Sequence, residues 1–266
     1  MFEELLEEIA QKNGLRGVST SLKLATGLGA LLLTLSATGY PGPLFIALAL
    51  TGALLLLARI DPRTLVEVYA APCSFAVMGV VVIVLVSGGS GGAWSWQPLP
   101  WLSLSITPEG INRGWMVLCR TLGGVASLLF VALTTPMTDL FVVMRSCRVP
   151  PALIELVMVV YRTIFILLDQ LVRCYHAQVM RLGYSTRREA VRSFATLCGA
   201  VFIASWNAGE DQIRAREMRC YDGRLVPLGG TRPIEARPVL AVAGFLALGV
   251  VVTVLSGGMT LPGGAG

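Results

Sequence analysis

The amino-acid sequence predicts an all-α, polytopic integral membrane protein. Of its 266 residues, 55% are hydrophobic and only 14% are charged, and the mean hydropathy is +0.72, whereas soluble domains carry about 25% charged residues. Several charge-free stretches approach the roughly 20 residues that cross a hydrocarbon layer about 30 Å thick. Most of the 21 basic residues lie in one block before the last of these stretches. We therefore expect about five transmembrane helices and three cytoplasmic helices.

Residues 1–135 comprise an N-terminal arm and the first four predicted transmembrane helices. The arm, "MFEELLEEIAQKNGL", is acidic and amphipathic, so we do not interpret it as a cleaved leader. Charges are absent from residues 24–40, 41–58, 68–108 and 121–138. The segment 87–110 is rich in Gly, Ser, Pro and Trp, and we expect its tryptophans at the level of the lipid headgroups.

Two arginines precede the charge-free part of the fourth predicted span. Arg113 and Arg120 are seven residues apart, so they share one helix face. An unpaired charge well inside a transmembrane helix costs about 2.5–3.5 kcal/mol. We therefore expect Arg120 to face protein or water rather than lipid.

Residues 136–236 form the predicted cytoplasmic region, which opens with two helices. Pro136 and the pair Pro150–Pro151 delimit a short helix, because proline starts or ends helices more easily than it continues them. Pro151 fits the first turn of a long helix through about Leu182, terminated by Gly183. A polar stripe repeats every seven residues along it, at Glu155, Arg162, Asp169 and His176. This stripe indicates that residues 151–182 lie beneath the membrane rather than across it.

A second long helix follows, and a last transmembrane helix ends the chain. Ser185 or Thr186 is placed to cap the second long helix, and Gly223 to end it. Residues 237–266 then provide the final span and an exterior tail. The basic residues predict a multi-pass protein of the cell membrane with a cytoplasmic N-terminus. The pI of about 9.1 is therefore a signal of topology, and we expect no nucleic-acid partner.

A short basic signature occurs twice in the cytoplasmic region. "AQVMRLGY" (177–184) and "AREMRCYDG" (215–223) both contain Ala-x-x-Met-Arg and are placed at the ends of the two long helices. Arg181 and Arg219 could simply complement the negative end of the helix macrodipole. Alternatively, two equivalent tips could dock onto two equivalent acidic grooves of a symmetric partner, since guanidinium suits a buried carboxylate. Macrodipole complementation does not require the shared Ala, Met and Tyr.

Several function classes lack support in the sequence. There is no G-x-x-x-x-G-K-[ST] motif, no acidic residue within the predicted spans and no nucleophile–base arrangement. We therefore expect neither an enzyme nor a self-contained transporter, and no cofactor or metal on this chain. The cysteines are scattered, without ligand-like spacing to the single histidine: Cys73, Cys119, Cys147, Cys174, Cys198 and Cys220. A membrane subunit that couples to an external motor fits better.

The cytoplasmic region resembles the T component of energy-coupling-factor (ECF) transporters, in particular its cobalt-transport, CbiQ-type branch. The resemblance rests on "TTPMTDL", the turn before "RVPP", "ELVMVVYR" and "AQVMRLGY", and it is strong over residues 107–223. The N-terminal spans resemble the family less, although "STSLKL" fits. In the second arginine motif, Arg216 replaces the family's Met and Cys220 replaces its Gly.

The resemblance implies a transmembrane coupling subunit. Arg181 and Arg219 would dock in grooves of two ABC-type ATPase subunits and transmit ATP-driven movement to a separate substrate-binding membrane subunit, which holds the metal. Their neighbours in the grooves would be Met180, Leu182, Gly183, Tyr184, Met218, Cys220 and Tyr221. If position 220 requires φ > 0, cysteine is strained there and the second tip docks more weakly.

Cobalt is the expected cargo, and two alternatives remain open. The same role could serve nickel or a vitamin such as biotin. A protein of another class, a membrane scaffold that binds anionic lipid, would carry diffuse Lys and Arg clusters. After the first span the basic residues here are all Arg, and two of them lie in the matched motifs.

Overall fold

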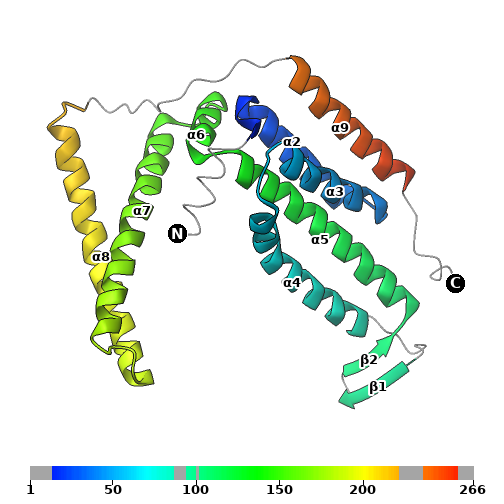
Figure 1. The fold of residues 1–266 in the computed structure, drawn as a ribbon, viewed down its shortest axis with the longest axis horizontal. Coiled ribbons are helices and arrows are strands. Elements are labelled where there is room, and N and C mark those ends of the chain that lie inside the picture. The colour runs from blue at the N-terminus through cyan, green and yellow to red at the C-terminus, as the bar shows by residue number, and fades with distance from the viewer. Residues whose placement is uncertain (1–13, 87–93, 100–101, 222–235, 257–266) are drawn as a thin grey trace. The chain divides into compact units, whose positions relative to one another are not determined.

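The computed structural model describes residues 14–86, 94–99, 102–221 and 236–256 (Figure 1). The chain divides into two compact units. The membrane unit comprises the described residues of 1–140 and 230–266. The described residues of 141–229 form the second unit, which we call the coupling unit after the role that the sequence predicts for it. The predicted features of the N-terminal arm, Trp101 and the exterior tail lie outside the described residues.

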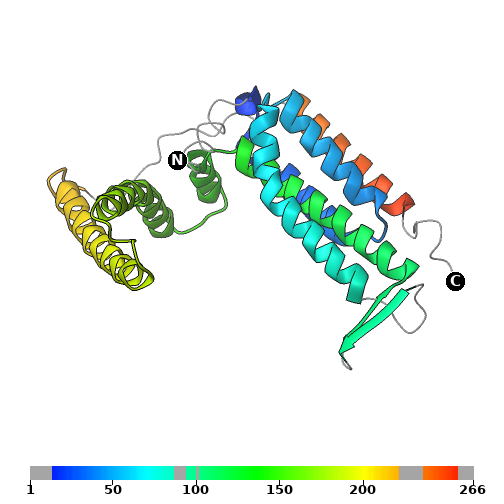
Figure 2. The same ribbon diagram turned by 60° about the horizontal axis from the view of Figure 1, so that its bottom comes forward.

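The membrane unit is a bundle of apolar helices around a central one. After a 3₁₀ turn, η1 (Gly14–Gly17), its elements are α2 (Thr20–Ser36), α3 (Pro41–Leu56), α4 (Pro62–Val86), the strands β1 (Trp94–Leu99) and β2 (Leu102–Ile106), α5 (Pro108–Thr134) and α9 (Ala236–Leu255). Helix α5 packs against α2, α3 and α4, and α9 packs against α2 and α3 (Figure 2). Gly123 permits this close packing, because a Cβ there would lie 2.7 Å from Thr34 Cγ2 and 2.9 Å from the Pro43 carbonyl oxygen.

The predicted all-helical membrane fold is confirmed, with one addition. The antiparallel hairpin β1–β2 lies between α4 and α5, within the segment 87–110, for which sequence analysis predicted no strand. By length and composition α4, α5 and α9 can each cross a membrane, whereas α2 and α3, at 17 and 16 residues, are shorter apolar helices. Helix α7 (Pro151–Met180) also meets these criteria, so its position beneath the membrane stays a prediction based on its polar stripe.

Arg120 contacts protein, as expected. Its guanidinium donates a hydrogen bond to the carbonyl oxygen of Ala37, the C-cap residue of α2. A helix leaves its last carbonyls without intrahelical partners, so the arginine on α5 satisfies one of them inside the bundle. The Arg113 side chain, by contrast, is exposed.

The coupling unit contains the two long helices predicted from the sequence. Helix α6 (Met137–Ser146) spans the boundary between the units, and α7 and α8 (Arg187–Glu217) form an antiparallel pair. Gln212 of α8 donates a hydrogen bond to Thr163 of α7 at 2.8 Å. Thr186 caps α8, since its side chain accepts from the Glu189 backbone N–H. The helix ends at Glu217, before Gly223, which lies outside the described part of the chain.

Candidate functional site: two helix tips that carry arginine

The first tip, residues 177–184, ends α7 in a tight hydrogen-bonded turn. Arg181 is the C-cap residue, and Leu182 adopts a left-handed backbone with φ 57°. The Leu182 N–H donates to the Val179 carbonyl oxygen at 3.0 Å, and the Gly183 N–H donates to the Gln178 carbonyl oxygen at 2.9 Å. These two bonds define a Schellman motif, which satisfies carbonyls that a helix end leaves unpaired.

The second tip, residues 215–221, has the same backbone turn. Cys220 is left-handed with φ 51°, and its N–H donates to the Glu217 carbonyl oxygen at 3.0 Å. The Tyr221 N–H donates to the Arg216 carbonyl oxygen at 3.1 Å. Arg219 therefore occupies the position in this turn that Arg181 occupies in the first. The sequence repeat is thus also a repeat in three dimensions.

Two expectations about the helix ends are corrected. The sequence predicted that Gly183 and Gly223 terminate the long helices, because glycine adopts φ > 0 without steric cost. The left-handed residues are instead Leu182 and Cys220. Gly183 is needed for a different reason, since a Cβ there would lie 2.6 Å from Ser193 Oγ. The expected strain at Cys220 is present, because a left-handed backbone costs an L-residue about 1–2 kcal/mol.

The turn alone does not distinguish these tips, because α6 ends in the same way. Arg148 is left-handed with φ 59°, and the Val149 N–H donates to the Met144 carbonyl oxygen at 3.3 Å. The residue before Arg148, however, is Cys147 rather than arginine. What sets the two long helices apart is the Met-Arg pair immediately before the left-handed residue.

Apolar side chains next to the two arginines are exposed. Met180 is 85% exposed, Leu182 is 74% exposed and Met218 is 80% exposed. The side chains of Arg181 and Arg219 are also exposed, and neither forms an ion pair within the described residues. An exposed apolar group beside a guanidinium has the chemistry of a surface that binds another protein.

The first tip is braced by its own helix and by the start of α8. Ser193 Oγ donates to the Gly183 carbonyl oxygen at 2.7 Å, and the Tyr184 hydroxyl donates to Gln178 Oε1 at 2.8 Å. Nearby, hydrogen bonds from Ser185 and then Thr186 lower the pKa of the Glu189 carboxyl. These contacts explain the compact turn between α7 and α8.

The second tip is braced by Tyr221. Its hydroxyl donates to Glu155 Oε2 at 2.5 Å, and its ring centroid lies 5.9 Å from Arg216 Cζ. Glu155 lies near the start of α7, 66 residues earlier in the chain. Sequence analysis placed Glu155 in the polar stripe and in the motif "ELVMVVYR" but did not identify its partner, because Tyr221 is distant in sequence.

A separate polar contact ties the first membrane helix to the end of α5. Lys23 Nζ donates to the Thr134 carbonyl oxygen at 2.8 Å, and Thr20 Oγ1 donates to Asp139 Oδ2 at 3.4 Å. Lys23 is only 4% exposed. The motifs "STSLKL" and "TTPMTDL", which sequence analysis quoted separately, therefore meet inside the membrane unit.

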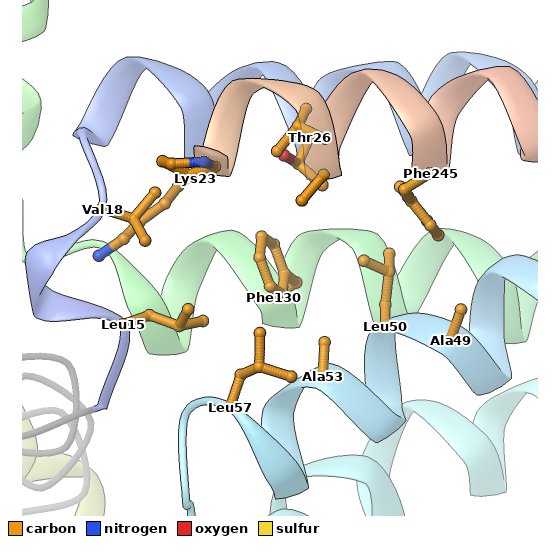
Figure 3. A pocket seen from close by; sticks show the side chains of 13 residues that line it. Leu15, Val18, Lys23, Thr26, Ala49, Leu50, Ala53, Leu57, Phe130 and Phe245 are labelled. Atoms are coloured by element: carbon orange, nitrogen blue, oxygen red, sulfur yellow. The ribbon is translucent and has the colours of Figure 1, made fainter. Parts of the chain in front are cut away.

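The membrane unit also holds a cavity of about 230 Å³ between η1, α2, α3, α5 and α9 (Figure 3). Its lining is apolar apart from Lys23 and Thr26, with Phe130 and Phe245 among the side chains that face it. Within the described ranges, no three His, Cys, Asp or Glu residues cluster in a way that could hold a metal ion.

Comparison with known proteins identifies the family. Residues 11–228 match the model of the family described as CbiQ, cobalt transport protein. The chain belongs to the CbiQ family. It is 35% identical over 249 residues to a putative fused cobalt transport protein CbiMQ of Methanocorpusculum labreanum, a match that covers 92% of this chain and 41% of that protein. The chain thus corresponds to less than half of the fused relative.

Two further relatives align along nearly their whole length. An uncharacterized protein of Methanocaldococcus jannaschii is 29% identical over 98% of this chain and 97% of its own length. The cobalt transport protein CbiQ of Rhodobacter capsulatus is 28% identical over 93% of this chain and 98% of its own. The resemblance to the cobalt branch of the T components is therefore confirmed, and the chain is a multi-pass membrane member of this family.

Proposed function

We propose that this CbiQ-family chain is the transmembrane coupling subunit of an ECF-type importer of cobalt ions. In this proposal Arg181 and Arg219 dock in the grooves of two ABC-type ATPase subunits. Movement driven by ATP then passes through α7 and α8 to a separate substrate-binding membrane subunit. The chain itself hydrolyses no ATP and holds no cofactor. It lies in the cell membrane with its N-terminus in the cytoplasm.

The observation that carries this proposal is the equivalence of the two tips. Each presents exposed Met and Arg at the same two positions of the same backbone turn. One docking geometry repeated on one chain suits a partner that offers the same groove twice, as two copies of one ATPase would. A guanidinium that enters a desolvated groove can pair there with a carboxylate through two parallel hydrogen bonds.

The macrodipole alternative is weaker for the second tip. Arg214 and Arg216 already lie in the last turn of α8, where they complement the negative helix end. Arg219 lies beyond them, in the terminating turn. A third arginine adds little to macrodipole complementation, which fades within one turn, so docking accounts for Arg219 better.

The exposed apolar surface of α8 supports the proposed contact with a substrate-binding membrane subunit. Large apolar side chains along this helix are exposed in the isolated chain, namely Val191, Phe194, Phe202, Ile203, Trp206 and Ile213. Such an extensive exposed apolar surface is suited to packing against a helical membrane protein. Cobalt as cargo is supported by the family description and by the names of the fused and the Rhodobacter relatives.

Capture of ATPase subunits in detergent tests this function. The tagged chain is compared with Arg181→Glu, Arg219→Glu and the double variant, and Arg192→Glu on the exposed surface of α8 is the matched control. Breaking one buried charge pair costs about 2–5 kcal/mol, roughly 30-fold or more in affinity. We expect partial loss in each single variant, complete loss in the double variant and no loss in the control. ATPase retained by the double variant would refute the proposal.

A further inference from the structure

The two tips share a backbone turn, but their tyrosines bind different partners. In the first tip, the Tyr184 hydroxyl donates to Gln178, six residues earlier in the same tip region. In the second tip, the Tyr221 hydroxyl donates to Glu155, near the start of the other long helix. The tyrosine of the first tip therefore bonds within its own tip region, where Ser193 of α8 also holds the Gly183 carbonyl oxygen, whereas the tyrosine of the second tip bonds across the helix pair.

The contact across the helix pair is also the stronger of the two. A phenol that donates to a carboxylate forms a charge-assisted hydrogen bond, which is typically about 2.5–2.7 Å long and roughly twice as strong as a neutral one. The Tyr221–Glu155 distance is 2.5 Å, whereas the Tyr184 bond to a neutral amide oxygen is 2.8 Å. Glu155 is half-buried and Tyr221 is 36% exposed, so the strength of this bond derives from its charge and its length.

Tyr221 is well placed to set the position of Arg219. Its backbone N–H closes the turn that holds Arg219, and its ring lies against Arg216. Only the left-handed Cys220 separates it from Arg219. When the end of α8 moves relative to the start of α7, either the hydrogen bond from Tyr221 to Glu155 breaks or the first turn of α7 moves with the second tip.

We propose that Glu155 is a positioning residue for the second tip, which it holds through Tyr221 at the start of α7. The proposal rests on the proposed function, because the tip matters as an ATPase contact. It assigns unequal roles to the two tips. The first presents its arginine from a turn braced by the adjacent start of α8, and the second transmits displacement directly to the first turns of α7. From there, the edge contact between Tyr161 of α7 and Phe141 of α6, with ring centroids 5.9 Å apart, carries it to the short helix.

Hydrogen exchange on the full-length chain in detergent tests the contact without any partner. Tyr221→Phe removes only the donor hydroxyl, and Tyr184→Phe is the matched control in the other tip. We expect amides 219–221 to exchange about two- to tenfold faster in Tyr221→Phe, with amides 181–183 unchanged. The Glu155→Leu variant should have the same effect, and Glu155→Leu with Tyr221→Phe should add nothing to either single change. Additive effects, or no change at 219–221, would overturn the assignment.

Transport by the assembled complex distinguishes positioning from a purely structural role, which would leave the ratio of ions transported to ATP hydrolysed unchanged. Glu155→Leu should retain both ATPase subunits but lower the number of ions transported per ATP hydrolysed, and Glu155→Gln, which keeps an acceptor oxygen, should restore most of that ratio. Tyr184→Phe should leave it unchanged. An unaltered ratio in Glu155→Leu would refute positioning. If even the wild-type chain captures no ATPase, the proposed function fails. The exchange experiment still tests whether the hydrogen bond between Tyr221 and Glu155 holds the second tip.

Discussion

The two units of this protein differ in how much apolar surface each buries in its own interior. The membrane unit has a continuous buried core that includes Ile46, Leu50, Leu54, Phe130 and Leu133. In the described coupling unit, the buried hydrophobic residues are only Phe141, Ile154 and Leu197. A unit that buries little apolar surface gains little stability from its own packing. The membrane unit therefore has a core of its own, whereas most large apolar side chains of α7 and α8 are exposed in the isolated chain.

A core substitution tests the membrane unit with the largest expected effect. Leu54 is 0% exposed in α3, and Leu48 on the same helix is 67% exposed. Leu54→Ala should destabilise the unit by about 2–5 kcal/mol, because it removes buried methyl groups and leaves a cavity. Leu48→Ala should cost far less, since its side chain faces outward. Reversible unfolding in mixed micelles measures both, and equal costs would contradict the buried core.

Substitution of Lys23 tests the polar contact inside the same core. Lys23→Met keeps the aliphatic length but removes the donor to the Thr134 carbonyl oxygen, so we expect a loss of about 1–3 kcal/mol. Thr20→Val breaks the longer bond to Asp139 and should cost less. The same unfolding assay applies. If Lys23→Met leaves the free energy of unfolding unchanged, the buried ammonium does not stabilise the end of α5.

The smallest effect is expected at the strained second tip. Cys220→Gly places glycine, the family motif's own residue, at φ 51°. Relief of the left-handed strain, offset by the greater backbone entropy of glycine, should stabilise the turn by up to about 1 kcal/mol. Slower amide exchange at 220–221 and tighter ATPase capture would follow. Weaker capture would mean that the cysteine side chain itself contributes to docking.

Local patterns predicted the features that depend on neighbouring residues. The absence of charge over long stretches predicted the apolar helices, Thr186 predicted the start of α8, and the repeated Met-Arg pair predicted two equivalent helix ends. The helix ends were predicted at Gly183 and Gly223, whereas the left-handed residues of the two tips are Leu182 and Cys220, the second of which the family motif had indicated. Leu182 and Cys220 take that conformation because the Schellman bonds and the surrounding contacts specify the position, whatever the residue's own preference.

The sequence by itself determined the class of the protein, its family and the residues proposed to couple it to a motor, because hydropathy, charge and short motifs are local properties. Only the tertiary structure decided which distant groups meet. Lys23 reaches Thr134 across 111 positions, and Tyr221 reaches Glu155 across 66. Such contacts depend on how helices pack, and no local pattern encodes that geometry. The different partners of Tyr184 and Tyr221 are therefore visible only in the folded chain.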